Sequence, residues 1–393
     1  MSIFNEIGQI KQKVRNMADD ALNHGWIDEK HHEELSKTLE KEKITVGIVG
    51  QMKNGKSTLL NALIFGDKIL PTASTPMTAS LSYLTYGKDP MIEVEFYSSD
   101  EWREIEKLSK ENAETDEIRA AKELVQTAHF IKDQSPDLLG KKKNITFNEL
   151  HEYVAEGGCY VPITKALNIH YPSERLKGID IVDTPGFNDP VSSRESRAKE
   201  FLSVADVVLV VLYAGRPFDK SDRDIIYEKI RVAGMGKVIL LLNKYDLILS
   251  DYGTVERVIS YVRKEHEKEV SDIEKEGEEI VANILRDAPI VPISSLMALL
   301  GKMEENSIHK DEDLKYHFEN IRNEFPTLKS QKDLLAYSKL ADLEEEIEKI
   351  VKRDKMRIIV NKPVTAVLGK MEEKHFKRKT DIYELENEEK ERT

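Results

Sequence analysis

Residues 50–57, Gly-Gln-Met-Lys-Asn-Gly-Lys-Ser, have the spacing of a phosphate-binding loop: one glycine, four residues, then Gly-Lys-Ser. The glycines allow backbone N–H groups to point at phosphate oxygens, and the start of the next helix adds a favourable field. We expect Lys56 to reach the β- and γ-phosphates and the Ser57 hydroxyl to bind Mg²⁺. The candidate nucleotide contacts are Gly50, Gln51, Met52, Lys53, Asn54, Gly55, Lys56, Ser57 and Thr58.

A second motif, Asp183-Thr184-Pro185-Gly186, follows the apolar run Ile-Asp-Ile-Val. A carboxylate at the end of a strand can hold Mg²⁺ through a water molecule. A glycine N–H three residues later can contact a γ-phosphate. The tetrapeptide alone is usually only a turn, but its place after a phosphate loop favours Asp183 and Gly186 as site residues.

The tetrapeptide Asn243-Lys244-Tyr245-Asp246 follows another buried strand and has a chemical reason to select guanine. The Asp246 carboxylate can accept hydrogen bonds from N1–H and N2–H₂ of guanine, whereas adenine offers no donor at either place. A site of that kind can discriminate by ~10⁴ or more, because the wrong base leaves a buried charge unpaired. Lys244 can lie along the base, and Asn243 can tie this loop to the phosphate loop.

A weaker candidate is Ser294-Ser295, which follows the run Pro-Ile-Val-Pro-Ile. The backbone of these two residues could contact the guanine carbonyl oxygen. A polar strand-to-helix loop without any contact to nucleotide remains the alternative.

Hydrophobic periodicity indicates how these motifs are positioned. Apolar β-branched runs alternate with helical segments, which predicts an α/β fold with a mainly parallel sheet covered on both faces. The predicted strands are 44–50, 91–97, 166–171, 179–184, 206–213, 237–243 and 289–294. Before them, apolar residues spaced by three and four predict a helix over the first twenty residues, and a second helix is expected over 28–41.

Composition excludes several classes of protein. The 393 residues carry a net charge of −13, which argues against a basic surface for nucleic acid. The single cysteine excludes an internal disulfide and a cysteine-built zinc site, and it favours a reducing, cytoplasmic compartment. No run of ~18 apolar residues exists, so no segment is expected to span a bilayer. The charge-dense stretch 263–279 is expected to be an exposed helix.

Several longer stretches resemble the bacterial dynamin-like proteins, a branch of the large GTPases. They are GQMKNGKSTLLNAL, LPTASTPMTA, YPSERLKGIDIVDTPGFNDP and ADVVLVVLYAGRPF. The resemblance covers roughly residues 41–354. It implies a phosphate-loop GTPase domain at 41–354, helices of a neck at 1–40 and a C-terminal neck helix at 355–393. It also implies GTP and GDP as ligands with Mg²⁺, and a hydrolase that produces GDP and phosphate.

The resemblance also assigns roles to two more residues. The family places its first-switch threonine eight residues after the leucine of Leu-Pro, which gives Thr78 as a metal ligand beside Ser57 and Asp183; Thr72 and Thr75 are nearby alternatives. Lys53 occupies a position where guanylate-binding proteins have a catalytic arginine, so it could stabilise charge on the phosphates. A solvated loop lysine is an equally good reading of Lys53.

Two departures from related GTPases concern the attacking water. Many dynamins have Gln-Ser-type residues where this chain has Met52 and Lys53, and small GTPases have a glutamine where this chain has Phe187. No side chain in these positions is suited to orient a water molecule. Since dynamin-like GTPase domains pair face to face across the nucleotide, the resemblance implies that a second copy completes the site.

The resemblance further implies membrane remodelling by nucleotide-driven self-assembly and a peripheral place at the membrane. A membrane-contacting tip is not recognisable after Pro363, so we expect the trunk to be missing or supplied by another dynamin-like chain. The alternative function is a slow nucleotide-dependent switch or scaffold that recruits a protein partner. A phosphate-loop ATPase is disfavoured by Asp246.

Overall fold

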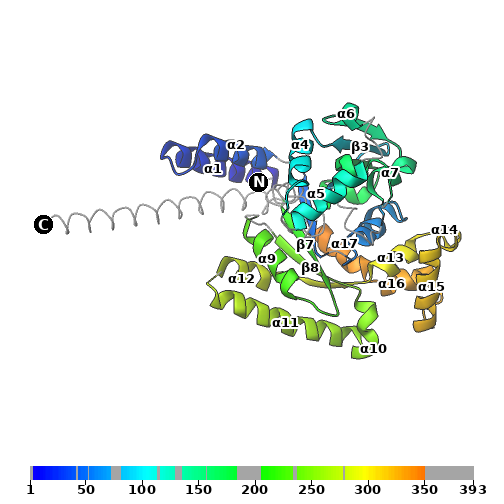
Figure 1. Ribbon diagram of the computed structural model, residues 1–393. Helices are drawn as coiled ribbons and strands as arrows, with labels where there is room; N and C mark the ends of the chain where they lie inside the picture. Colours follow the sequence, from blue (N-terminus) through cyan, green and yellow to red (C-terminus); the bar gives the residue numbers. More distant parts are fainter. Residues whose placement is uncertain are drawn as a thin grey trace.

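The computed structural model describes residues 3–40, 43–51, 53–71, 81–112, 116–128, 135–155, 157–183, 205–232, 237–277 and 279–349 (Figure 1). Nine strands in the described part of the chain form one sheet, in the order β4-β3-β5-β2-β6-β1-β7-β8-β9. The strands are β1 Ile44–Val49, β2 Leu81–Tyr86, β3 Met91–Phe96, β4 Lys142–Ile145, β5 Thr164–Tyr171, β6 Ile179–Asp183, β7 Val207–Tyr213, β8 Lys237–Asn243 and β9 Ile290–Ile293.

Most neighbouring strands run parallel, which confirms the predicted α/β fold with a mainly parallel sheet. The parallel pairs are β6–β1, β1–β7, β7–β8, β8–β9 and β2–β5. Antiparallel pairing joins β2 to β6 and joins β3 to both β4 and β5. The sequence analysis missed β2 and β4, because β2 (LSYLTY) has no apolar β-branched residue and three of the four residues of β4 are exposed.

The central strands are buried on both faces, which explains their continuous apolar sequences. In β7, Val207, Leu209 and Val211 belong to one core, and Val208, Val210 and Leu212 belong to the other. This alternation follows from the two-residue repeat of a strand. Each fully buried aliphatic side chain contributes roughly 1.5–3 kcal/mol, so the two cores fix the register of the central strands.

Two groups of helices supply the rest of these cores. The first core takes residues from α3 Lys56–Leu60, α4 Ser99–Leu108, α5 Asp116–Thr127, α13 Ser295–Lys302, α16 Gln331–Tyr337 and α17 Leu340–Lys349. The second takes residues from α9 Lys220–Val232, α11 Val255–Lys275 and α12 Glu279–Arg286. The first core also takes residues from α7 His151–Val154, α14 Glu305–Lys310 and α15 Glu312–Glu324, and Leu138 of α6 Ser135–Leu138 packs against it. The second core also takes Leu249 of α10 Leu249–Tyr252.

The two N-terminal helices form where the sequence predicts them, as α1 Ile3–Asn23 and α2 Glu29–Glu40. They project as a hairpin from the α/β domain (Figure 1). Ala18, Ala21, Ile27 and Leu35 form a small core between the helices. The assignment of this hairpin to a neck stays a prediction, and the proposed C-terminal neck at 355–393 lies outside the described residues.

Helix α11 corrects one expectation. The charge-dense stretch is helical, but it is not uniformly exposed, because His266 and Glu269 are buried. Glu269 lies 2.7 Å from the Arg223 guanidinium of α9. Charge-rich helices can bury a charged residue when the neighbouring helix supplies its counter-ion, which a helix read in isolation does not reveal.

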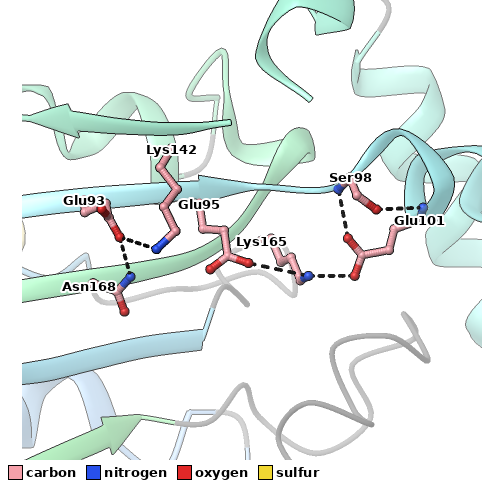
Figure 2. Close-up of polar contacts among 7 residues, drawn as sticks. All are labelled: Glu93, Glu95, Ser98, Glu101, Lys142, Lys165 and Asn168. Carbon is pink, nitrogen blue, oxygen red and sulfur yellow. Dashed lines mark hydrogen bonds and ion pairs between the residues drawn. The ribbon is translucent and has the colours of Figure 1, made fainter. Parts of the chain in front are cut away.

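Polar side chains connect the outer strands β3, β4 and β5 to α4 (Figure 2). Lys142 and Asn168 donate hydrogen bonds to the Glu93 carboxylate, at 2.7 and 3.0 Å. Lys165 lies 3.5 Å from Glu95 and 2.7 Å from Glu101. Glu101 also forms a capping box with Ser98 at the start of α4. The Lys165 contacts therefore fix the N-terminus of α4 against the sheet.

Candidate nucleotide-binding site

The phosphate-binding loop connects β1 to α3, as the sequence predicts. Both glycines are required by their surroundings. A Cβ atom on Gly50 would lie 2.5 Å from the Val211 carbonyl oxygen, and one on Gly55 would lie 2.4 Å from the Asn243 amide nitrogen. Gly55 also has φ of +87°, a conformation that favours glycine. The loop is therefore packed closely against the ends of β7 and β8.

Lys56 is buried, and its ammonium donates hydrogen bonds to the carbonyls of Gly50 and Gln51 at 2.8 and 3.1 Å. Burial lowers the pKa of Lys56, and the charge of Asp183 opposes that effect. Burial raises the pKa of Asp183 to about 6, and the charge of Lys56 opposes the shift. Lys56 and Asp183 are thus brought together by β1 and its neighbour β6.

Asp183 has an unsatisfied acceptor. Its Oδ1 is buried and has no hydrogen-bond partner within the described part of the chain. An orphaned carboxylate oxygen is costly unless a ligand satisfies it. The carboxylate beside the loop therefore fits the hard-oxygen chemistry of Mg²⁺, with Ser57 at the start of the adjacent helix α3.

Asn243 joins three segments of the site. Its amide donates to the Asn54 carbonyl at 2.6 Å, which is the connection to the phosphate loop that the sequence predicts. Its side-chain oxygen accepts from the backbone N–H groups of Lys244 and Ser295 at 2.9 and 3.0 Å. On the other side of the loop, the Asn54 amide donates to the Val211 carbonyl at 2.9 Å.

Asp246 is buried at 4% exposure, and its Oδ1 has no hydrogen-bond partner among the residues that the structure describes. Burial raises the pKa of Asp246, and a hydrogen bond with Ser294 opposes this shift. Lys244, which is partly buried, has φ of +61° and a pKa lowered by burial. A buried carboxylate with a free oxygen suits two guanine N–H donors, as the sequence predicts.

Ser294 and Ser295 lie beside this loop but have structural bonds of their own. The Ser294 hydroxyl caps α13 by accepting from the Met297 N–H, and the Ser294 N–H donates to the Ser338 carbonyl at 2.9 Å. The Ser295 N–H is engaged by Asn243. A contact of their backbone with guanine stays a prediction.

Tyr245, the third residue of the tetrapeptide, is fully buried. Its hydroxyl donates to the Tyr337 carbonyl at the end of α16, and the two rings lie 6.2 Å apart. The motif pattern gave no role to this position. The structure shows that Tyr245 connects the base-binding loop to the C-terminal helices.

Gln51 has partners that the sequence analysis missed. Its side-chain amide donates to Asp219 at 2.6 Å and to Asp222 at 2.8 Å, at the start of α9. Burial raises the pKa of Asp222 to about 6, against the opposing hydrogen bond from Gln51. The available signal was the pair of carboxylates in the sequence DKSD (219–222), which follows β7 after the five residues 214–218.

Not every predicted residue can be located. Met52, Thr78 and Gly186 lie outside the described residues. Lys53 is exposed with φ of +64°, and its charge contributes to the lowered pKa of Lys244, so the two cations are neighbours. Ser57 and Thr58 lie half-buried in the first turn of α3. The functional roles of all these residues remain predictions.

The site as a whole lies where the carboxyl ends of β1, β6, β7 and β8 meet. In an open α/β sheet this edge is the usual place for a ligand. It brings together one buried ammonium, a glycine-rich loop and two carboxylates with unpaired oxygens. These groups can bind a phosphate chain, a metal ion and a base with two adjacent N–H donors. Within the described residues, no helix combines the length and apolar character that crossing a bilayer requires.

Comparisons with known proteins agree with this geometry. A family model described as the dynamin family matches residues 46–245. Dynamin-like protein 1 of Campylobacter jejuni is 29% identical over 351 residues, which cover 87% of this chain and 45% of that protein. Dynamin-like protein A of Bacillus subtilis is 30% identical over 299 residues, covering 69% of this chain and 24% of that protein. The chain therefore spans half or less of the length of these two relatives.

Among solved structures, a chain of an oligomerised bacterial dynamin pair matches 99% of this chain and 58% of its own length. The TM-score is 0.55 and the sequence identity is 22%, so this likeness concerns the fold. That pair is described as providing a mechanism for the long-range sensing and tethering of membranes.

Proposed function

The chain belongs to the dynamin family, whose members are GTPases, and from this premise we propose that it binds GTP and hydrolyses it to GDP and phosphate with Mg²⁺. The observation that carries the proposal is the buried Asp246 carboxylate. Its free oxygen lies in a loop that Asn243 fixes to the phosphate-binding loop. A guanine base with two N–H donors satisfies that carboxylate, whereas adenine leaves it unpaired.

The phosphate chain is bound by the loop N–H groups and by Lys56. On binding, the Lys56 ammonium exchanges the carbonyls of Gly50 and Gln51 for β- and γ-phosphate oxygens. These are charge-assisted contacts in a buried place, where they are stronger than in water. Ser57, Thr78 and Asp183 hold Mg²⁺, which neutralises charge on the phosphates. The N–H of Gly186 contacts the γ-phosphate.

The test measures binding and turnover on the purified chain. We expect Mg²⁺-dependent phosphate release from GTP that EDTA abolishes, and binding of a fluorescent GDP that excess GTP displaces but excess ATP does not. Equal competition by ATP and GTP would overturn the assignment of Asp246. Binding without turnover at any protein concentration would instead favour the slow switch or scaffold that recruits a protein partner.

Self-association across the nucleotide is the second part of the proposal. The surface beside the site exposes Lys53 and also Leu247, a large apolar side chain at 53% exposure next to Asp246. A second copy that covers this surface would exclude water. The attraction between the Lys53 ammonium and the phosphates would then be stronger. We expect specific activity to rise with protein concentration, and Lys53→Ala to lose that rise while keeping its affinity for GTP.

Membrane remodelling is proposed as the output of this cycle, through self-assembly or through another dynamin-like chain. The relatives are named dynamin-like, and a bacterial dynamin pair shares the fold. Liposome sedimentation, electron microscopy and GTPase assays test the proposal together. We expect turnover to rise with liposomes or with a partner chain, and turnover that responds to neither would count against membrane remodelling.

A further inference from the structure

The α16–α17 junction, residues 337–340, accepts a hydrogen bond from each of two loops at the proposed base site. The Tyr245 hydroxyl donates to the Tyr337 carbonyl, and the Ser294 N–H donates to the Ser338 carbonyl at 2.9 Å. The two carbonyls are consecutive in the sequence, whereas the donors belong to different loops, one after β8 and the other after β9. One short stretch of backbone therefore holds both loops.

Both donors are directly connected to the Asp246 carboxylate. Tyr245 precedes Asp246 in the chain, and Ser294 forms a hydrogen bond with the Asp246 side chain. The carboxylate oxygen Oδ1 is buried and has no partner among the residues described. The chain neighbour and the hydrogen-bond partner of this carboxylate are thus both bonded to the junction, and together they set where the free oxygen lies.

The junction itself is buried and internally bonded. Ser338 is fully buried, and its hydroxyl donates to the Leu335 carbonyl at 2.6 Å and accepts from the Leu340 N–H at 3.2 Å. Lys339 has φ of +63°, a left-handed conformation that residues with a Cβ disfavour and that persists only where the surroundings fix it. The junction is therefore a defined support and not a loose connection between two helices.

The position of Asp246 matters because hydrogen bonds are directional. They weaken steeply when the angle at the hydrogen falls below about 120° or when the heavy atoms separate beyond about 3.2 Å. Guanine has an N2 amino group that hypoxanthine lacks, whereas both bases have the N1–H donor. A small displacement of the Asp246 carboxylate should therefore reduce the preference for guanine over hypoxanthine.

We propose that the α16–α17 junction positions Asp246 for guanine, through Tyr245 on one side and Ser294 on the other, and thereby sets how strongly the site prefers a base with an N2 amino group. The inference rests on the proposed binding of guanine nucleotide at Asp246. Tyr245 and Ser338 are positioning residues, because each is bonded to protein groups and acts through Asp246. A role in folding alone would lower stability and leave base preference unchanged.

The first test variant is Tyr245→Phe, which keeps the buried ring and removes only the donor to the Tyr337 carbonyl. The ligands are GDP and inosine diphosphate (IDP), which differ only by the N2 amino group. Displacement of a fluorescent GDP measures both Kd values. We expect the ratio of the Kd for IDP to the Kd for GDP to fall about tenfold, the value of one hydrogen bond. An unchanged ratio would overturn the proposal.

Tyr153→Phe is the matched control. Tyr153 is likewise a buried tyrosine whose hydroxyl is hydrogen-bonded, to Lys143 at 2.8 Å, but it lies in α7 with its ring 6.3 Å from that of Phe96 in β3. Each variant loses one buried hydroxyl, so both should lose thermal stability. We expect only Tyr245→Phe to lose base preference. An equal fall of the ratio in Tyr153→Phe would show that preference follows stability, which contradicts the proposal.

Ser338→Ala tests the junction without changing either donor. The variant loses the hydroxyl bonds to Leu335 and Leu340 but keeps the carbonyls that accept from Tyr245 and Ser294. We expect the ratio of the Kd for IDP to the Kd for GDP to fall by about threefold, less than in Tyr245→Phe because both donors remain. An unchanged ratio would confine the effect to Tyr245 and refute the role of the junction.

A measurement on the unmutated protein covers the case in which these variants do not fold. Coupling is reciprocal, so guanine must stabilise the junction contacts if these contacts favour guanine. The Ser294 amide reports on them, because its N–H donates to the Ser338 carbonyl. We expect its hydrogen–deuterium exchange to be about tenfold slower with GDP than with IDP bound. Equal exchange would refute the inference. Equal affinity of the unmutated protein for GDP and ADP would instead refute the proposed function.

Discussion

Carboxylates have cationic partners in the outer half of the sheet, formed by β3, β4 and β5 with α4, but keep unpaired oxygens at the nucleotide edge. In the outer half, each of Glu93, Glu95 and Glu101 lies within 3.5 Å of a lysine, and Lys165 serves two of these carboxylates (Figure 2). At the nucleotide edge, Asp183, Asp222 and Asp246 each bury an oxygen that has no partner among the described residues. None of the unpaired buried atoms in the described part of the chain belongs to β3, β4, β5 or α4.

This contrast indicates which polar groups serve the fold and which serve a ligand. A half-buried carboxylate with a lysine beside it stabilises its own neighbourhood. Burial raises the pKa of an unpaired carboxylate, and the buried charge destabilises the protein until a ligand satisfies it. Substitutions that remove a paired charge in the outer half should therefore lower stability without changing nucleotide binding. Substitutions that neutralise an unpaired carboxylate at the nucleotide edge should not lower the stability of the nucleotide-free protein.

The largest effect is expected for Asp246→Asn. The amide presents a donor where the carboxylate had an acceptor, so preference should shift from GTP toward xanthosine triphosphate by about a thousandfold. Thermal stability without nucleotide should not fall, since a buried charge is removed. Competition binding with GTP, ATP and xanthosine triphosphate measures the shift. Asp251→Asn, at an exposed site in the adjacent α10, serves as the control and should keep guanine preference.

Lys56→Ala should weaken GTP binding by about a hundredfold, because two charge-assisted contacts to the phosphates are lost. The free energy of unfolding of the nucleotide-free protein should change little, since burial already lowers the pKa of Lys56. Isothermal titration and urea denaturation on the same sample separate the two quantities. A loss of unfolding free energy as large as the loss of GTP-binding free energy would contradict the contrast between the outer half and the nucleotide edge.

Asp222→Asn should remove a pH dependence of stability. The folded pKa of Asp222 is raised to about 6, above the ordinary 3.8, so the folded state binds this proton more tightly than the unfolded state. The penalty is absent below pH 3.8, grows as pH rises to about 6, and is constant above. At pH 7 the variant should be more stable by about 2 kcal/mol, and the gain should vanish near pH 4.

Urea denaturation between pH 4 and pH 8 measures this prediction. Asp224→Asn is the control, since that carboxylate is exposed on the same helix α9. A stability curve of Asp222→Asn parallel to that of the unmutated protein over the whole range would contradict the assigned pKa.

The smallest effects are expected in the outer half, for Lys165→Met and for its control Lys142→Met. In Lys165→Met, two partly buried carboxylates lose their cation, which should lower the free energy of unfolding by about 1–2 kcal/mol. The Kd for GTP should be unchanged. Lys142→Met, whose side chain is 55% exposed, should cost less than about 0.5 kcal/mol. A changed GTP affinity in Lys165→Met would show that the halves are coupled.

The sequence predicted the strands at the nucleotide edge well and those of the outer half less well. Strands β1, β7 and β8 are apolar because both their faces are buried, so their sequences contain the signal. Strand β4 has mostly exposed lysine and asparagine residues, and its pairing with β3 depends on tertiary context that local propensity does not contain.

The candidate site shows the same division. Lys56, Asp183, Asn243 and Asp246 lie in motifs with fixed spacing, and the structure brings them to one edge. The partners of Gln51 escape such patterns, because they are residues whose spacing from Gln51 is not fixed by one chemical task. Tyr245 lies inside a motif, yet its partner at Tyr337 is 92 residues away.

The two ends of the nine-stranded sheet limit how copies of this chain can aggregate. At one end, β4 has only four residues and begins with two lysines. At the other, β9 contains Pro292, which has no N–H to donate, and the chain after it is hydrogen-bonded to Ser338. Short, lysine-bearing or proline-bearing edges are poor templates for another strand. Any association of copies would therefore use side-chain surfaces and not edge-to-edge pairing of strands.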